Sequence, residues 1–253
     1  MNTLPVALQV YSIREEAEKD FVKAMQEVKK MGYDGVELAG LYGHTPEEIR
    51  DILKEVGLTP ISAHVPYEAF LADTLKTAED YAIIGCKYVA IPYLMDDQRY
   101  GSEYFEKFMK NVPAIAEACH KFGITLMYHN HDFEFQKTED GEYILDYMYR
   151  IYGKDIWQVE LDTCWTRVSG EDPATYMKKY ANRLPVVHLK DYSEGTPFEF
   201  RAVGQGVQDM PSILAQAIAG GSEWVVVEQD RHTEFTALED AHISRDYLRS
   251  LGW

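Results

Sequence analysis

Residues 128–135, with the sequence YHNHDFEF, bring together side chains that commonly bind metal ions. They include His129, His131 and Glu134, and they directly follow the apolar run 124–127. One interpretation is a polar surface loop. The other is that an apolar strand delivers these side chains to a shared site, where imidazole and carboxylate groups could hold an ion.

Three later apolar runs also end in polar residues two positions apart. The pairs are Glu160 and Asp162, His188 and Lys190, and Glu228 and Asp230. Side chains two apart on a strand share a face, so each pair can point into one opening. Buried carboxylates need compensation, which a divalent cation supplies. This cysteine-free donor set suits Mn²⁺, Zn²⁺, Co²⁺ or Mg²⁺, and it predicts a metal site.

Other residues at the ends of apolar runs have structural explanations beside the functional ones. Glu37 and His64 each occur at a strand end without a paired polar residue. Glu37 could bind a helix N-terminus, and His64 could have a structural role. Tyr11 and Trp165 could belong to the core or form a wall against which a sugar ring stacks. Nothing marks Cys164 as a nucleophile, and we expect a small buried residue.

The elements that must position these residues follow a regular alternation. Apolar runs that predict strands occur at residues 6–10, 33–38, 58–65, 87–91, 124–129, 157–162, 184–189 and 223–229. Predicted helices run from 21 to Gly32 and from 46 to Gly57, and lie near 71–84, 102–121, 142–151, 173–181, 209–219 and 237–250. Thr45 and Glu48 predict a capping box at the second helix.

Eight strands and eight helices in about 250 residues predict one (β/α)8 TIM barrel over residues 1–253. The main alternative is a doubly wound open sheet. A dinucleotide-binding sheet of that type shows a glycine-rich turn after an early strand, and this sequence has none there. Reactive groups of such barrels lie at the carboxyl ends of the strands, where the polar pairs occur.

Composition excludes several classes of function. The chain has 25 basic and 42 acidic residues, a formal charge of −17, and no basic run, which argues against nucleic acid. No apolar run approaches the roughly 20 residues that span a bilayer. Three distant cysteines indicate a reducing compartment. The first ten residues lack a signal-peptide pattern, so we expect a cytoplasmic protein.

Motifs along the whole chain resemble the xylose isomerase-like TIM barrel superfamily, in its sugar phosphate isomerase/epimerase branch. The matching stretches are LQVYSIR, YDGVEL, SAHVPY, YHNHDFEF, ELDTCW, VVHLKDY, VGQGVQDM and VVVEQD. The resemblance implies one divalent metal (Mn, Co, Zn or Mg) held by His129, Asp162, His188 and Glu228. Epimerases have a glutamate at the position of His129, so Glu160, His131 or Glu134 are alternative fourth ligands. Repair nucleases of the superfamily have a histidine at the position of Trp165, which argues against DNA cleavage.

The resemblance also implies a sugar isomerase or epimerase that abstracts a proton next to a sugar carbonyl. Glu228, His129 and Lys190 are the implied catalytic residues. The implied substrate contacts are Glu37, His64, His131, Glu134, Glu160, Trp165 and Arg201. One alternative is a metal-dependent dehydratase or lyase that acts on an inosose or a 3-keto-glycoside, because the YHNH segment is also similar to inosose dehydratases. The other alternative is a sugar-binding barrel without catalysis.

The expected partner is a small sugar or keto-sugar, and barrels of this superfamily often form homodimers. For a phosphorylated substrate, the sequence offers as phosphate contacts only Arg201 and the amides of the VGQG segment, residues 203–206. Arg201 could equally bind a carboxylate or lie at the surface. The two glycines could serve a tight turn alone.

Overall fold

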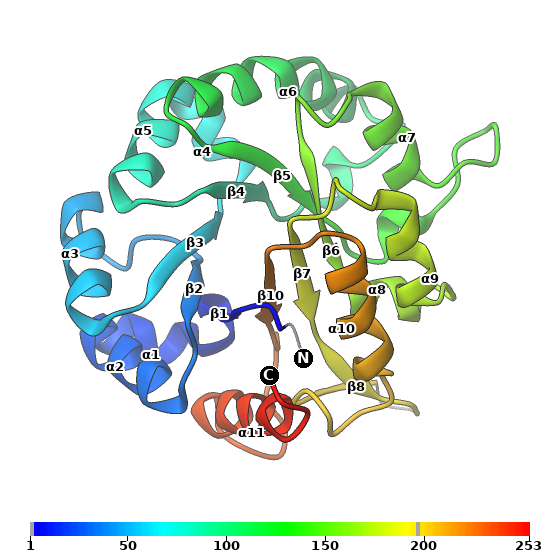
Figure 1. The fold of residues 1–253 in the computed structure, drawn as a ribbon. Helices are drawn as coiled ribbons and strands as arrows, with labels where there is room; N and C mark the ends of the chain where they lie inside the picture. Colours follow the sequence, from blue (N-terminus) through cyan, green and yellow to red (C-terminus); the bar gives the residue numbers. More distant parts are fainter. Residues whose placement is uncertain (1–2, 196–197) are drawn as a thin grey trace.

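The computed structural model describes residues 3–195 and 198–253, and it shows a closed barrel of eight parallel strands (Figure 1). The order around the barrel is β1-β10-β7-β6-β5-β4-β3-β2. The barrel strands are β1 (Val6–Gln9), β2 (Gly35–Leu38), β3 (Thr59–His64), β4 (Tyr88–Ile91), β5 (Thr125–His129), β6 (Gln158–Asp162), β7 (Val186–Leu189) and β10 (Trp224–Val227). This topology confirms the predicted (β/α)8 barrel.

Helices surround the barrel and connect its strands (Figure 1). The longer ones are α2 (Phe21–Met31), α3 (Pro46–Val56), α5 (Thr74–Ile84), α6 (Glu103–Lys121), α7 (Ile144–Ile151), α10 (Met210–Ala219) and α11 (Ala237–Ser250). Shorter ones are α1 (Arg14–Lys19), α4 (Tyr67–Ala72), α8 (Thr163–Val168), α9 (Pro173–Met177) and the 3₁₀ turns η1 (Val10–Ile13), η2 (Asp96–Gln98), η3 (Phe133–Phe135) and η4 (Lys178–Tyr180). Within the described ranges, no helix combines the length and apolar character needed to cross a membrane.

Helix α3 shows how local sequence sets the ends of these elements. The Thr45 hydroxyl accepts a hydrogen bond from the Glu48 amide at 3.2 Å, and the Glu48 carboxylate accepts one from the Thr45 amide at 2.8 Å. This confirms the predicted capping box, and Pro46 occupies the first turn, where its missing N–H costs nothing. Gly57 ends the helix in the left-handed region at φ 81°, which glycine adopts without strain.

The inside of the barrel changes from apolar to polar within two residues along its strands. A separate apolar cluster fills its lower part, formed by Ala7, Ile61, Tyr88, Ala90, Met127, Val186 and Val226. Two positions further along, on the same face, β5 presents His129, β7 presents His188 and the end of β10 presents Glu228. The apolar layer therefore forms a rigid floor for the polar one.

The structure differs from the predicted elements in several places. It adds the short helices α1 and α8, and the helix expected near 173–181 is α9 followed by η4. The helix expected at 71–84 is two helices, α4 and α5, because Asp73 adopts an extended conformation and caps α5 by accepting from the Lys76 amide at 3.0 Å. An antiparallel hairpin of β8 (Asp191–Ser193) and β9 (Glu199–Arg201) follows β7. This hairpin has no counterpart among the predicted elements, because its strands of three residues are too short to show a period.

Candidate active site and metal centre

A cavity of about 730 Å³ opens at the carboxyl ends of the barrel strands. Five predicted site residues line it: His64, His129, His131, Trp165 and Glu228. Five others have an exposed fraction of 0% and lie directly behind this wall: Glu37, Glu160, Asp162, His188 and Lys190. A second depression, of about 770 Å³, lies between α7 and η4 and contains none of the predicted site residues.

Aromatic rings form much of the cavity wall, and they come from Tyr11, Tyr93, Trp165 and Phe200. Such rings offer flat apolar faces to a sugar ring. Two cations, Arg14 and Arg231, also line the cavity. One Arg14 nitrogen donates to the backbone oxygens of Tyr11 and Asp230, at 2.9 and 3.2 Å. Both arginines, Tyr93 and Phe200 were not among the predicted site residues. Arg14 ends the LQVYSIR stretch, which was the signal that could have identified it, and no motif marks the other three.

His129, Asp162, His188 and Glu228 form the four-residue group that the family resemblance implied as metal ligands. One ligand atom from each lies within 4.8 Å of the others, and all four residues are buried. His188 Nδ1 is 3.0 Å from Glu228 Oε2, while His129 Nε2 is 3.8 Å from Asp162 Oδ2 and 4.0 Å from Glu228 Oε2. We call this group the outer quartet.

Strand register and local hydrogen bonds orient the outer quartet. Asp162 pairs with His188 across β6 and β7, so both residues stand at one level of the barrel. The Trp165 amide donates to Asp162 Oδ1 at 2.9 Å, and Asn130 Oδ1 accepts from the Asp162 amide at 3.0 Å. Asp162 Oδ2 is buried and accepts no hydrogen bond from the described residues, although the Lys190 ammonium lies 3.1 Å from it. Two imidazoles and two carboxylates, one of them with this oxygen, fit a divalent cation.

Lys190 places a buried cation beside the outer quartet. Its ammonium lies 2.9 Å from Glu228 Oε2, 3.1 Å from Asp162 Oδ2 and 3.0 Å from Asp230 Oδ1. Burial lowers the pKa of Lys190, but these three carboxylates outweigh it and raise that pKa well above its usual value. Burial raises the pKa of Glu228, but Lys190 and His188 hold it well below its usual value. Lys190 is therefore protonated and Glu228 ionised at neutral pH.

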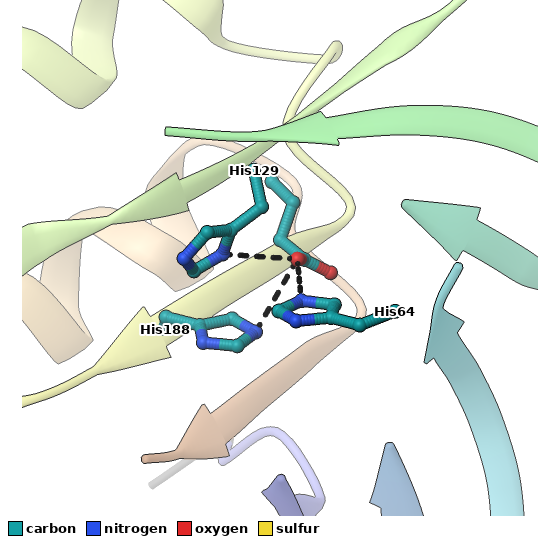
Figure 2. A group of neighbouring side chains, drawn as sticks. His64, His129 and His188 are labelled. Carbon is teal, nitrogen blue, oxygen red and sulfur yellow. Dashed lines mark hydrogen bonds and ion pairs between the residues drawn. The ribbon is translucent and has the colours of Figure 1, made fainter. Parts of the chain in front are cut away.

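A second layer of charged groups lies against the two histidines of the outer quartet (Figure 2). Glu160 Oε2 lies 2.6 Å from His64 Nε2 and 3.1 Å from His129 Nδ1. Glu37 Oε1 lies 2.7 Å from His188 Nε2 and 3.1 Å from His64 Nε2. His64, His129, Glu160 and His188 make a second group with the spacing of metal ligands, which we call the inner quartet.

Two polar residues that the sequence analysis did not select complete this layer. Gln9 donates to Glu37 Oε1 at 2.7 Å, and the Ser62 hydroxyl donates to Glu37 Oε2 at 2.5 Å. Both lie opposite Glu37 in the strand register, on β1 and β3. A polar residue in an otherwise buried strand was the signal that could have identified them.

Burial and neighbouring charges set the ionisation of the second layer. Burial and the repulsion of Glu37 raise the pKa of Glu160 to about 7. Burial would also raise the pKa of Glu37, but the attraction of His64 and His188 keeps it well below its usual value. For His64, burial lowers the pKa, but Glu37 and Glu160 outweigh it and raise that pKa to about 10. The layer therefore combines an ionised Glu37 with a cationic His64.

Two predicted substrate contacts lie outside the cavity wall. Glu134 accepts hydrogen bonds from the Tyr128 hydroxyl at 2.5 Å and from the His131 amide at 2.8 Å, which fixes the loop after β5. Arg201 lies against Glu199 at 2.6 Å and lines a separate small cavity. His131 does reach the main cavity, and its Nδ1 is buried with no hydrogen-bond partner in the described part of the chain.

The amides of the VGQG segment are already occupied. Asp191 Oδ2 accepts from the Gly204 amide at 3.0 Å and from the Gly206 amide at 3.1 Å, and Asp191 Oδ1 accepts from the Gln208 amide at 3.1 Å. A Cβ on Gly206 would collide with the Asp191 carboxylate and the Tyr192 carbonyl oxygen. The glycines thus serve a tight turn around a carboxylate.

Known proteins resemble this chain in both sequence and structure. An inosose dehydratase of Geobacillus kaustophilus is 23% identical over 248 residues, which is 83% of this chain and 80% of that protein. A sugar phosphate isomerase/epimerase of Parabacteroides distasonis has a TM-score of 0.83 at 25% identity, covering 97% of this chain and 98% of that one. A zinc-bound IOLI protein has a TM-score of 0.75 at 15% identity, covering 98% of each chain.

The sequence model of one protein family matches nearly the whole barrel. Its description is "Xylose isomerase-like TIM barrel", and the match runs from residue 25 to residue 251. The matched segment includes β2 to β10 and every member of both quartets. This chain belongs to the xylose isomerase-like TIM barrel family.

Proposed function

We propose that this protein is a divalent-metal-dependent enzyme that abstracts a proton next to the carbonyl group of a keto-sugar or keto-cyclitol. Isomerisation or epimerisation is the first candidate outcome. The observation that carries the proposal is the outer quartet, whose donor atoms converge at the base of an aromatic-walled cavity. The similar proteins described above, an isomerase/epimerase, a dehydratase and a zinc-bound barrel, support it.

In this proposal each charged residue has a separate task. The outer quartet would hold one Mn, Co, Zn or Mg ion, which supplies Lewis-acid polarisation of a carbonyl oxygen. Glu228 lines the cavity in its ionised form and can accept a proton from the substrate carbon. His131 faces the cavity from the β5 side as a neutral ring, because burial lowers its pKa to about 3, and it can hydrogen-bond a substrate oxygen there. Lys190, held protonated behind the wall, can donate to a substrate oxygen.

Elimination, as in a dehydratase or lyase, is the second candidate outcome. The carboxylates that line the cavity in the described structure, Glu228 and Asp230, both follow β10. Epimerisation by two carboxylates needs one on each face of the substrate, and β5 offers histidines instead. Elimination needs one base and one acid, for which Glu228 and the Lys190 ammonium suffice. The sequence similarity to inosose dehydratases agrees with this outcome.

An unphosphorylated substrate is part of the proposal. A (β/α)8 barrel often binds phosphate through amides in the loops after its last strands. Here Gly204 and Gly206 donate their amides to Asp191, whose negative charge also opposes a phosphate. Arg201 is engaged by Glu199 and Glu234. Arg14 and Arg231 line the cavity, but Arg14 is held by the backbone oxygens of Tyr11 and Asp230. The aromatic walls favour a neutral ring stacked on them.

Solvent deuterium exchange tests the shared first step. Tag-free protein loaded with Mn²⁺, Co²⁺ or Zn²⁺ is incubated in D₂O with ketoses, inososes and 3-keto-glycosides and followed by NMR. We expect deuterium at the carbon next to the carbonyl of the true substrate. A product that differs from the substrate in mass only by the incorporated deuterium identifies isomerisation or epimerisation, and loss of water or an aglycone identifies elimination. Metal content by mass spectrometry should be about one equivalent.

Two variants give the controls for this experiment. Asp162→Ala/His188→Ala should lose both the metal and the exchange. Glu228→Gln should lose exchange while it still binds the sugar. Sugar binding by wild-type protein without exchange would instead support a binding barrel, and a metal-free wild type after reconstitution would contradict the proposed mechanism.

A further inference from the structure

Three histidines converge on a single carboxylate oxygen at the centre of the barrel (Figure 2). Glu160 Oε2 lies 2.6 Å from His64 Nε2, 3.1 Å from His129 Nδ1 and 3.4 Å from His188 Nε2. Glu160 is fully buried, and its other oxygen has no hydrogen-bond partner in the described residues. The histidines come from three strands, β3, β5 and β7.

This contact determines which nitrogen of His129 carries the proton. Glu160 Oε2 faces three ring nitrogens and can itself carry at most one proton, so we assign it as the acceptor and Nδ1 of His129 as the N–H group. In the neutral ring the lone pair is then on Nε2, which faces Asp162 and Glu228. The Lys190 ammonium contacts the same two carboxylate oxygens, and an ion held among them would take this lone pair.

The same reasoning applies to His188 through a different carboxylate. Its Nε2 lies 2.7 Å from Glu37 Oε1 and 3.4 Å from Glu160 Oε2, so it donates toward the second layer. Its Nδ1 faces the outer quartet instead, 3.0 Å from Glu228 Oε2, and is the nitrogen that could ligate an ion there. Both histidines of the outer quartet therefore turn one ring nitrogen toward the second layer and the other toward the same volume.

We infer that Glu160 is a positioning residue of the metal centre and not itself a ligand. It holds the ring of His129, and with Glu37 the ring of His188, in the orientation and tautomer that outer-quartet binding requires. The inner quartet is then the hydrogen-bonded support of one ion, not a second ion site. This inference rests on the proposed metal function, and it assigns Glu160 a role different from the substrate contact expected from sequence.

Metal affinity in the absence of substrate tests the inference. Wild type, Glu160→Gln and Glu160→Ala are prepared metal-free, and Zn²⁺ and Co²⁺ affinities are measured by competition with a chelator. Loss of a carboxylate behind a ligand histidine typically weakens metal binding about 10- to 100-fold, and we expect this for Glu160→Ala, with a smaller loss for Glu160→Gln. The Co²⁺ absorption spectrum should also change, because the ligand rings reorient.

Asp240→Asn is the matched control, since Asp240 is a buried carboxylate that bonds a histidine, His232, outside both quartets. It should leave metal affinity and the Co²⁺ spectrum unchanged. Melting temperatures of the metal-free variants distinguish a loss of metal affinity from a general loss of stability. A general loss of stability lowers the melting temperature without weakening the metal affinity of the folded protein.

Three outcomes would overturn the inference. Folded Glu160→Gln and Glu160→Ala that bind Zn²⁺ as tightly as wild type would show that Glu160 does not position the ligands. A second equivalent of metal in wild type that disappears in His64→Ala would make Glu160 a ligand. Wild-type protein that binds no metal would contradict the proposed metal-dependent function itself. This outcome is distinguishable from the other two, because in both of those the wild type binds metal.

Discussion

At the scale of single residues, Lys190 is the cation around which the buried acids are organised. It contacts the carboxylates of Asp162, Glu228 and Asp230 at 2.9 to 3.1 Å and is inaccessible to solvent. Taking such charges out of water is costly unless opposite charges compensate for one another. The site therefore depends on this side chain for stability as well as for chemistry.

Replacing Lys190 with methionine should destabilise the metal-free protein by about 3–5 kcal/mol, because three buried carboxylates lose their cation. Saturating Zn²⁺ should reduce the loss, since a divalent cation compensates two of the same carboxylates. Urea unfolding with and without Zn²⁺ measures both effects. Lys87→Met removes an exposed pair with Glu223, and it should change stability by about 0.5 kcal/mol or less. Equal losses with and without metal would contradict this expectation.

Glu134 should make the stability of the protein depend on pH. Burial raises its pKa from 4.5 to about 7, although hydrogen bonds from Tyr128 and the His131 amide oppose the shift. The folded state thus binds this proton more tightly, and the resulting stability is present below pH 4.5 and lost as the pH rises through 7. Glu134→Gln should therefore gain about 2.5 kcal/mol relative to wild type between pH 5 and pH 8.

Urea unfolding at the two pH values measures this difference. The control is Glu117→Gln on the exposed side of α6, where solvent surrounds the carboxylate and the difference should stay constant. A Glu134→Gln variant whose stability relative to wild type is the same at pH 5 and pH 8 would contradict the assignment.

At the scale of elements, the turn that contains VGQG is built around Asp191 and not around a ligand. Two amides of the segment, from Gly204 and Gly206, donate to this carboxylate, as do the amides of Gln208 and Tyr192. The turn follows the β8–β9 hairpin, and Phe200 on β9 supplies one wall of the cavity. The geometry of this turn therefore affects the shape of the site without touching the substrate.

Gly206→Ala should destabilise the protein by about 1–3 kcal/mol, because the added Cβ meets the Asp191 carboxylate and a backbone oxygen. Gly153→Ala is the matched control, since a Cβ there meets nothing within 4 Å. Thermal unfolding of the two variants checks the difference. Equal melting temperatures would mean that the turn relaxes to accept the methyl group.

At the scale of the whole molecule, the barrel is closed by pairing between its first and last strands. β1 pairs with β10 in parallel, and the Ser12 hydroxyl accepts from the Gln229 amide at 3.0 Å. Because the outer quartet draws on four barrel strand ends, its ion would bind the folded barrel and not the unfolded chain. Metal binding and global stability are therefore linked.

Metal should raise the unfolding free energy by about 2.7 kcal/mol when its free concentration is 100 times its dissociation constant. Differential scanning calorimetry over a Zn²⁺ or Mn²⁺ series measures this, and a chelator should reverse it. The Asp162→Ala/His188→Ala protein should show no shift. A shift of equal size in that variant would place the ion elsewhere.

The sequence alone was sufficient for the barrel and for the polar pairs at the ends of its strands. The elements show local signals: the hydrophobic period of each strand and helix, the Thr45 cap, and glycines such as Gly57. These signals can be recognised from the sequence without knowing the tertiary contacts. Parallel strands end at one edge of a barrel, so the polar pairs that follow β5, β6, β7 and β10 had to meet. The elements that were missed, such as the β8–β9 hairpin, are too short for a periodic signal.

Only the tertiary structure decided which partner each of these side chains takes. His64 and Glu160 are 96 positions apart, and Glu37 and His188 are 151 apart, yet both pairs lie within hydrogen-bond distance. Arg201 turns to Glu199 and away from the cavity. A strand end sets where a side chain begins, but its rotamer and its partner depend on residues that the fold brings from distant parts of the chain.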